Sequence, residues 1–229
     1  MAKFFSVLGP VLFVYAICGH ASIASERLYV AGGCIWCVEA DFESISGVIE
    51  VRTGFSSGST KNPNYKDVSK GGTGHKESVE IEFDPLQVSI EELLYKFLRS
   101  IDVTDGQGQF CDRGDSYTTA IFPRIKEQKR AAEKAVKDAS KTLGKPIETQ
   151  ILSFTGFYPT EAYHQDYYKG KKLVFTCYGP RKKVNAYKLY RKTCGRDTRL
   201  KIFGAATLFS NKTKADILSN LTSRQYCHV

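Results

Sequence analysis

The chain has 229 residues, of which 42% are hydrophobic and 25% charged. This composition is typical of a globular protein and excludes fibrous, collagen-like and disordered chains. The formal net charge is +9, and twelve of the basic residues lie between Lys169 and Lys201, where Asp197 is the only acidic residue. No nucleic-acid motif accompanies this basic segment, so we interpret it as a solvated face and expect no nucleic-acid partner.

Residues 1–24 have the pattern of a secretory signal peptide. Lys3 supplies the positive start, Phe4 to Cys18 is a short apolar core, and the small residues Ser22 and Ala24 suit a cleavage site. About fifteen apolar residues are too few to span a bilayer comfortably, which favours removal over anchoring. We therefore expect a periplasmic or secreted mature protein.

Hydrophobic periodicity predicts six elements in the order β-α-β-β-α-β. Strands are expected over 27–31, 48–54, 77–83 and 117–122, and helices over 35–45 and after the capping residue Ser89, through 98. Glycine, serine and asparagine predict a long loop over 56–74. This order is typical of a ferredoxin-like plait, so the predicted fold class is α/β, a two-layer α/β sandwich.

Additional C-terminal segments follow the plait. A helical pattern runs from Arg124 to Leu143, and residues 148–154 favour one more strand. After about Tyr158 the chain is rich in tyrosine and lysine and has weak periodicity. We expect one domain over 25–204 and a loosely attached tail over 205–229.

The cysteines allow two interpretations. Seven are present, and with Cys18 in the predicted leader an even number remains for an oxidising compartment, where three structural disulfides would be ordinary. Cys34 and Cys37, however, lie three positions apart, and such a pair is more often redox-active or metal-binding. A structural zinc site needs a second close Cys or His pair, whereas His75 and His164 are isolated, so we expect no metal.

Cys34 is the strongest candidate for a nucleophile. It follows Gly32 and Gly33, at the point where a predicted strand ends and a predicted helix begins. The free N–H groups and the dipole at a helix N-terminus favour negative charge, which predicts a lowered pKa for this thiol. The two glycines let a substrate approach without a side chain in the way.

Three further sequence motifs become informative when they are considered together with the motif around Cys34. Singly, a loop tyrosine, a glutamate at a strand entrance and an aspartate in a turn are ordinary structural residues. In order, the four motifs are Gly-Gly-Cys-Ile-Trp-Cys at 32–37, Asn-Pro-Asn-Tyr at 62–65, Thr-Gly-His-Lys-Glu at 73–77 and Asp-Arg-Gly-Asp-Ser-Tyr at 112–117. The set resembles peptide methionine sulfoxide reductase A. The resemblance continues through 157–159, 163–168 and 194–197 and covers about residues 27–204.

The resemblance implies a reaction and a role for each motif residue. The substrate would be the S-epimer of methionine sulfoxide, free or in proteins, and the Cys34 thiolate would attack its sulfur. Glu77 would protonate the leaving oxygen and share one proton with Cys34, since two adjacent anions are costly. Tyr65 and Tyr117 would donate hydrogen bonds to the sulfoxide oxygen, and Asp112 would orient the substrate or a bound water.

The resemblance also implies how the substrate and the oxidised enzyme are handled. Ile35, where the family usually has phenylalanine, and Trp36 would form an apolar wall for the S-methyl group. A second cysteine must condense with the Cys34 sulfenic acid, and our ranking places Cys194 first and Cys37 as its rival, with Cys111 third. A thioredoxin-like partner would reduce the disulfide, in a monomer with no bound cofactor. The alternative function is a general thiol–disulfide oxidoreductase that uses the Cys34–Cys37 pair.

Overall fold

The computed structural model describes residues 24–176 and 179–199. Positions 1–23 of the predicted signal peptide, the predicted tail over 205–229 and the cysteines at 18, 177 and 227 lie outside these ranges. Within the described ranges, no helix combines the length and apolarity needed to cross a membrane.

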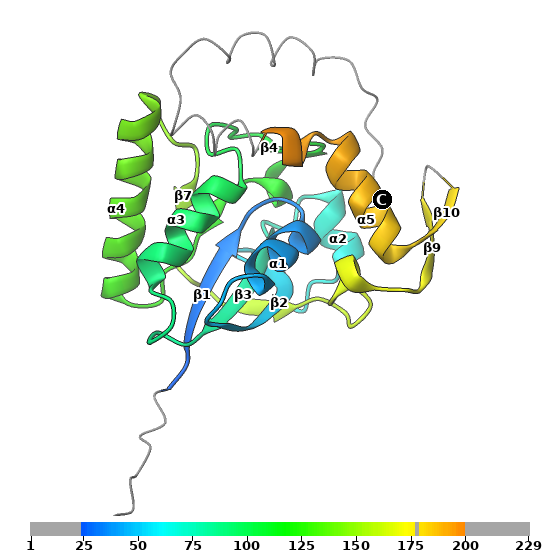
Figure 1. Ribbon diagram of the computed structural model, residues 1–229, viewed down its shortest axis with the longest axis horizontal. Coiled ribbons are helices and arrows are strands. Elements are labelled where there is room, and N and C mark those ends of the chain that lie inside the picture. Colours follow the sequence, from blue (N-terminus) through cyan, green and yellow to red (C-terminus); the bar gives the residue numbers. More distant parts are fainter. Residues whose placement is uncertain (1–23, 177–178, 200–229) are drawn as a thin grey trace, which may run out of the picture.

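A six-stranded sheet forms the centre of the molecule (Figure 1). Its order is β7-β6-β1-β3-β2-β8, and its strands are β1 (Glu26–Ala31), β2 (Val48–Ser56), β3 (Lys76–Phe83), β6 (Ala120–Ile121), β7 (Gln150–Ile151) and β8 (Phe157–Pro159). The middle four strands pair antiparallel in the order β6-β1-β3-β2, which is the arrangement of a ferredoxin-like plait. The predicted fold class is therefore confirmed, with β7 and β8 added at the two edges.

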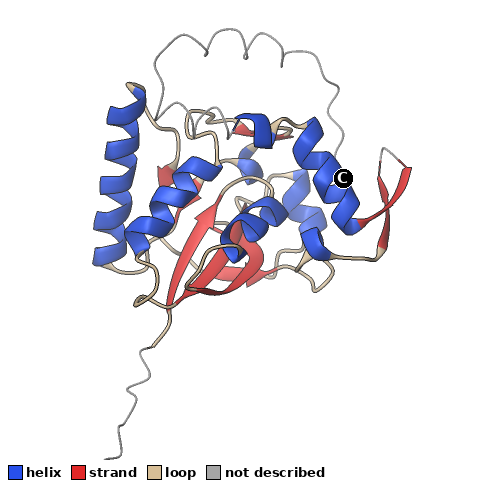
Figure 2. Cartoon of the chain, in the orientation of Figure 1, coloured by secondary structure: helices blue, strands red, loops and turns tan. Residues whose placement is uncertain are grey.

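Two helices cover one face of this sheet, and a third packs beside them (Figure 2). They are α1 (Ile35–Glu43), α3 (Ile90–Ser100) and α4 (Lys126–Leu143). Ser89 caps α3 as expected, since its side chain accepts a hydrogen bond from the amide of Glu92 at 3.2 Å. Apolar side chains of α1 and α3, such as Phe42 and Phe97, are fully buried against β1 and β3.

Two plait predictions are wrong in detail. The expected loop over 56–74 contains a short helix, α2 (Tyr65–Lys70), which Asn64 caps by accepting a hydrogen bond from the Asp67 amide. It buries only Val68, so its sequence carries almost no hydrophobic period. The fourth strand, expected over 117–122, is only the two-residue β6, because the start of this range belongs to the 3-10 helix η1 (Asp115–Tyr117). That turn follows the small hairpin of β4 (Gly108–Gln109) and β5 (Asp112–Arg113).

The segment after Tyr158 is more regular than its sequence suggests. It forms the 3-10 helix η2 (Tyr167–Lys169), the hairpin of β9 (Leu173–Thr176) and β10 (Gly179–Lys182), and the helix α5 (Lys183–Thr193). Figure 1 shows α5 and the hairpin at the opposite end of the molecule from α4. Helix α5 buries Ala186, Tyr187 and Tyr190, and tyrosines dominate this face in place of the aliphatic residues that mark most core helices.

Candidate active site

The turn between β1 and α1 fixes the backbone of Cys34. Cys34 is the N-cap of α1, and its carbonyl oxygen accepts hydrogen bonds from the amides of Cys37 and Val38 at 3.1 and 3.2 Å. Gly33 before it has a φ of +76°, and a Cβ there would lie 2.5 Å from the Cβ of Gln109. Only glycine fits this position, so the glycine pair serves the turn itself.

Most predicted site residues line one cavity of about 260 Å³. The residues that line it come from five separate stretches of the chain, yet their side chains meet beside Cys34. The cavity is lined by Cys34, Trp36, Tyr65, Ser69, Glu77, Asp112, Tyr117 and Tyr190. Ile35 and Cys37 are buried next to this cavity, in the apolar cluster that contains Cys34 and Trp36.

Glu77 at the start of β3 has the environment of a neutral acid. Its side chain is only 2% exposed, and its Oε2 accepts a hydrogen bond from the Ile35 amide at 3.3 Å. Burial, and then the negative charge of Asp112, raise the pKa of Glu77 well above its usual range. Its Oε1 is buried without a hydrogen-bond partner among the described residues, so the carboxyl keeps one oxygen for a ligand.

The Cys34 thiol does not have the lowered pKa expected from its helix N-terminus. The side chain is 5% exposed, and burial raises its pKa well above the usual range. Hydrogen bonding to the Cys37 thiol and the charge of Asp112 act in the same direction, while the buried guanidinium of Arg196 opposes them. The expectation of a lowered pKa is wrong because desolvation outweighs the helix terminus.

Two tyrosines in the cavity keep their protons. Burial raises the pKa of Tyr65 and of Tyr117 well above the usual range, and the charge of Glu77 is the next cause for both. The Trp36 ring stacks on Tyr167 with centroids 3.9 Å apart and on Tyr65 at 6.0 Å. Of these three rings, those of Trp36 and Tyr65 line the cavity. They form an apolar wall beside the hydroxyl donors of Tyr65 and Tyr117.

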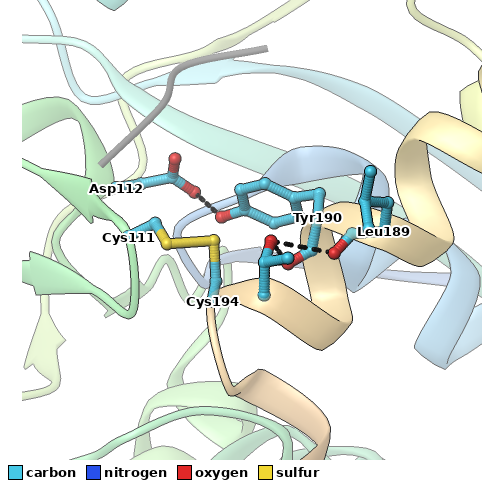
Figure 3. Close-up of a disulfide and its surroundings, with 6 residues drawn as sticks. Cys111, Asp112, Leu189, Tyr190 and Cys194 are labelled. Atoms are coloured by element: carbon cyan, nitrogen blue, oxygen red, sulfur yellow. Dashed lines mark hydrogen bonds between the residues drawn. A yellow bond between two sulfur atoms is a disulfide. The ribbon is translucent and has the colours of Figure 1, made fainter. Parts of the chain in front are cut away.

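A disulfide and a buried hydrogen bond join α5 to the cavity (Figure 3). Cys111, in the β4–β5 turn, is bonded to Cys194 at the end of α5, across 83 positions of sequence. The Tyr190 hydroxyl donates to Oδ2 of Asp112, next to Cys111. The two links hold Asp112 and Tyr190 against each other, and they leave Cys34 and Cys37 as free buried thiols.

One group of acidic residues has the spacing of a metal site. Oxygen atoms of Glu39, Glu43 and Asp166 lie within 4.8 Å of one another. Lys169 forms ion pairs with Glu43 and Asp166 at 2.6 and 2.8 Å, and burial raises the pKa of Glu39 to about 8. Lys169 therefore neutralises two of the three carboxyl groups, and Oε2 of Glu39 is buried without a hydrogen-bond partner among the described residues; the cluster includes none of the cavity residues.

The comparisons with known proteins agree with this geometry. The family model of peptide methionine sulfoxide reductase matches residues 26–194. Peptide methionine sulfoxide reductase MsrA 2 of Caulobacter vibrioides is 42% identical over 182 residues, covering 79% of this chain and 86% of that protein. MsrA of Listeria innocua is 45% identical over 155 residues, covering 67% and 88%. The MsrA/MsrB protein of Vibrio cholerae is 43% identical over 184 residues, 79% of this chain but 45% of that longer protein.

The chain belongs to the peptide methionine sulfoxide reductase A family.

A solved structure supports this assignment. Methionine sulfoxide reductase A of Corynebacterium diphtheriae superposes with a TM-score of 0.57 at 30% identity, covering 63% of this chain and 74% of that one. The reduced form of Mxr1 from Saccharomyces cerevisiae, 24% identical with a TM-score of 0.61, covers 63% and 84% and shares the fold. The protein is accordingly a thiol-dependent peptide-methionine (S)-S-oxide reductase, as its motifs indicated.

Sequence reasoning missed Tyr190 and Ser69 in the reductase cavity. Tyr190 lies in the basic segment, where charge obscures the pattern of buried tyrosines, but it precedes Cys194 by one helical turn. That spacing, read as a helix, would have placed Tyr190 and the cysteine on one face. Ser69 belongs to the short helix α2, for which the sequence carries no comparable signal.

Proposed function

We propose that the cavity binds methionine sulfoxide with its oxygen at Glu77 and its sulfur at Cys34. The unpartnered Oε1 of Glu77 is the observation that carries this proposal. A buried carboxyl held neutral has a proton to give, and the sulfoxide oxygen can accept it. Tyr65 and Tyr117 supply hydroxyl donors to the same oxygen, and the Trp36 ring faces the methyl group.

The chemical step balances without a cofactor. The Cys34 sulfur bonds to the sulfoxide sulfur while Glu77 protonates the oxygen. The protonated oxygen then passes to the Cys34 sulfur, and both the sulfur–oxygen bond of the substrate and the transient sulfur–sulfur bond break. The products are methionine and a sulfenic acid on Cys34, which is oxidised by the two electrons that the substrate gains. The raised pKa of both groups means that the resting pair holds its protons, so the thiolate forms as the sulfoxide accepts a proton.

Cys37 is the resolving cysteine that the contacts favour. Its thiol is buried and free, and it is hydrogen-bonded to Cys34, whereas the sulfur of Cys194 is already bonded to Cys111. Our sequence-based ranking placed Cys194 first; the contacts support the reverse order. In this scheme the Cys37 thiol condenses with the Cys34 sulfenic acid, releases water and forms a Cys34–Cys37 disulfide.

Single-turnover chemistry separates the two resolving candidates. Cys37→Ser should release one equivalent of methionine and then stop when thioredoxin is the reductant, because no disulfide forms for it to reduce. Cys194→Ser should continue to turn over. The opposite pattern would return the resolving role to Cys194.

The location and the reductant belong to the same proposal. The signal-peptide pattern over 1–24 supports export to a periplasmic or extracellular space, where a monomer would receive electrons from a thioredoxin-like protein. Expression with an alkaline phosphatase reporter fused after residue 60 tests the export directly. Fusion protein that is expressed but has no phosphatase activity would exclude it, because the disulfides of the reporter do not form in the cytoplasm.

Cys34→Ser is the decisive test of the reaction. It should abolish reduction of the S-epimer of a methyl sulfoxide while circular dichroism stays unchanged, because it removes the attacking sulfur and keeps the side-chain volume. Retained turnover would remove Cys34 from the mechanism. Wild-type enzyme should leave the R-epimer unreduced in the same chiral assay.

The Cys34–Cys37 pair also supports the alternative function, general thiol–disulfide exchange, since the two thiols are in contact. An insulin-reduction assay distinguishes the two activities. The buried thiols predict little insulin reduction beside rapid sulfoxide reduction. Strong insulin reduction without sulfoxide turnover would favour the alternative.

A further inference from the structure

One face of the β9–β10 hairpin presents apolar side chains to solvent. Phe175 pairs with Pro180, and Leu173 pairs with Lys182, so strand alternation places all four on the same face. Phe175 is 85% exposed and Leu173 is 59% exposed. On the opposite face, Val174 is buried in the cluster that surrounds the active-site cysteines. The hairpin is thus packed against the body on one side, and no residue of the described ranges 24–176 and 179–199 covers Phe175 or Leu173 on its other, bare side.

The surroundings of the bare face are uniformly basic. The sequence holds no Asp or Glu between Tyr167 and Arg196. The ion pairs of this stretch of the described chain are made by Lys169, Arg191 and Arg196. Six other basic residues are exposed and form no ion pair with described residues: Lys171, Lys172, Arg181, Lys182, Lys188 and Lys192. Their charge is therefore available to an anionic partner.

The shape of the hairpin decides between two kinds of anionic partner. Figure 1 shows it projecting at the end of the molecule beyond α5, and it is a ribbon of two paired strands. A protein partner would need a hollow that matches this protrusion. A lipid surface needs none, because its headgroup region adapts to an inserted aromatic side chain.

We propose that the β9–β10 hairpin docks the protein on an anionic lipid surface. Phe175 and Leu173 enter the headgroup region, and Lys182 on the same face, together with the exposed lysines nearby in sequence, lies against the lipid phosphates. This combination of a small apolar wedge and a basic patch gives reversible attachment. The proposal is independent of the reductase chemistry, and its failure would leave that assignment unchanged.

Vesicle co-sedimentation of the full chain tests the attachment. Vesicles of mixed phosphatidylglycerol and phosphatidylcholine should bind the protein at least about tenfold more strongly than phosphatidylcholine vesicles, since each nearby basic residue contributes about fivefold. Phe175→Ser combined with Lys182→Glu should lower this binding by about tenfold or more. The N-terminal apolar segment is common to every variant and cancels in the comparison.

A matched control changes the same residue types elsewhere. Leu86 is 72% exposed in the turn between β3 and α3, and Lys137 is exposed on α4. Leu86→Ser with Lys137→Glu carries the same change in charge and polarity and should bind vesicles about as wild type does. Both double variants should retain sulfoxide reduction in solution, which verifies their fold.

A site-specific probe then locates the contact. Phe175→Trp should gain tryptophan fluorescence that brominated lipid in the anionic vesicles quenches, whereas Leu86→Trp should not. Equal binding to both vesicle types, wild-type binding by the hairpin variant, or binding to polyglutamate without binding to vesicles would each overturn the lipid proposal. The last result would assign the patch to acidic protein partners.

Discussion

The hydrophobic clusters of the plait and of the segment after Tyr158 contain different types of residue. The main core of the plait contains aliphatic residues and phenylalanines from both sheet and helices. The cluster around α5 contains Trp36 and three buried tyrosines, Tyr167, Tyr187 and Tyr190. A tyrosine buries a large apolar ring and still brings a hydroxyl, so this second region can enclose polar groups that an aliphatic core would exclude.

The active site lies where the two regions meet. The plait contributes Cys34, Glu77 and Tyr117, which carry the proposed chemistry, and α5 contributes Tyr190 to the same cavity. Contacts across the boundary include the Cys111–Cys194 disulfide, the Tyr190–Asp112 hydrogen bond, and the hydrogen bond from the Asp166 amide to Glu39 on α1. The comparison predicts that substitutions on the plait side change the rate of the chemical step. Substitutions in α5 should instead change how well the cavity binds its substrate.

The largest effect is expected on the plait side, at Glu77. Glu77→Gln should lower the turnover number by about 10²–10⁴-fold, since it removes the acid and keeps the shape. Because the pKa of Glu77 is raised, the wild-type rate should fall as pH rises through that pKa and the acid loses its proton. Pre-steady-state rates across pH measure both effects. Wild-type turnover in the variant would show that another group protonates the oxygen.

The next largest effect is expected on stability, from the Cys111–Cys194 disulfide that joins the plait to α5. Cys111→Ser with Cys194→Ser should lower the free energy of unfolding by about 4.5 kcal/mol, because the link closes a loop with a sequence separation of 83 in the unfolded chain. Denaturant melts of oxidised wild type and the variant measure the difference. Reduced wild type serves as the control and should unfold like the variant. Equal stability of all three would show that the link contributes nothing to the fold.

The elements of the plait could be predicted from the sequence, whereas the contacts between the plait and the segment after Tyr158 could not, and the reason is physical. The alternation of Val79, Ile81 and Phe83 and the Ser89 cap are local signals, and each determined its element correctly. It was the family resemblance carried by the four motifs that brought Cys34, Glu77 and Tyr117 together. The pairing of Cys111 with Cys194 depends on a tertiary approach between distant segments, and cysteine count alone leaves many connectivities open. Helix α5 was missed because lysines and tyrosines hide its apolar stripe.

A smaller effect is expected at the contact between α1 and the segment after Tyr158. Burial raises the pKa of Glu39 to about 8, so the folded state keeps a proton that the unfolded state releases near pH 4.3. The unfolding free energy should therefore fall as pH rises through that window. Glu39→Gln keeps an oxygen for the Asp166 amide and should reduce this loss by on the order of 2 kcal/mol.

Denaturant melts at several pH values between about 5 and 8 compare Glu39→Gln with wild type. Glu43→Gln is the control, because Glu43 lies on the same helix and pairs with Lys169 at the surface of the same cluster. It should leave the slope against pH nearly unchanged. A wild-type slope in Glu39→Gln would mean that Glu39 is ionised in the folded protein.

The smallest expected effect distinguishes substrate binding from the chemical step within the cavity. Tyr190→Phe removes the hydroxyl that donates to Asp112 and keeps the ring, and a hydrogen bond to a charged group is worth about 1.5 kcal/mol or more. We expect kcat/KM to fall by about tenfold, mainly through KM, if Asp112 orients the substrate, as the family resemblance implies, and takes no part in the proton transfer. Tyr187→Phe is the matched control on α5: its hydroxyl accepts from Arg191 at 2.8 Å, and its loss should leave KM unchanged. If kcat falls instead of KM in Tyr190→Phe, then α5 contributes to the chemical step, and the division of labour between the two regions is wrong.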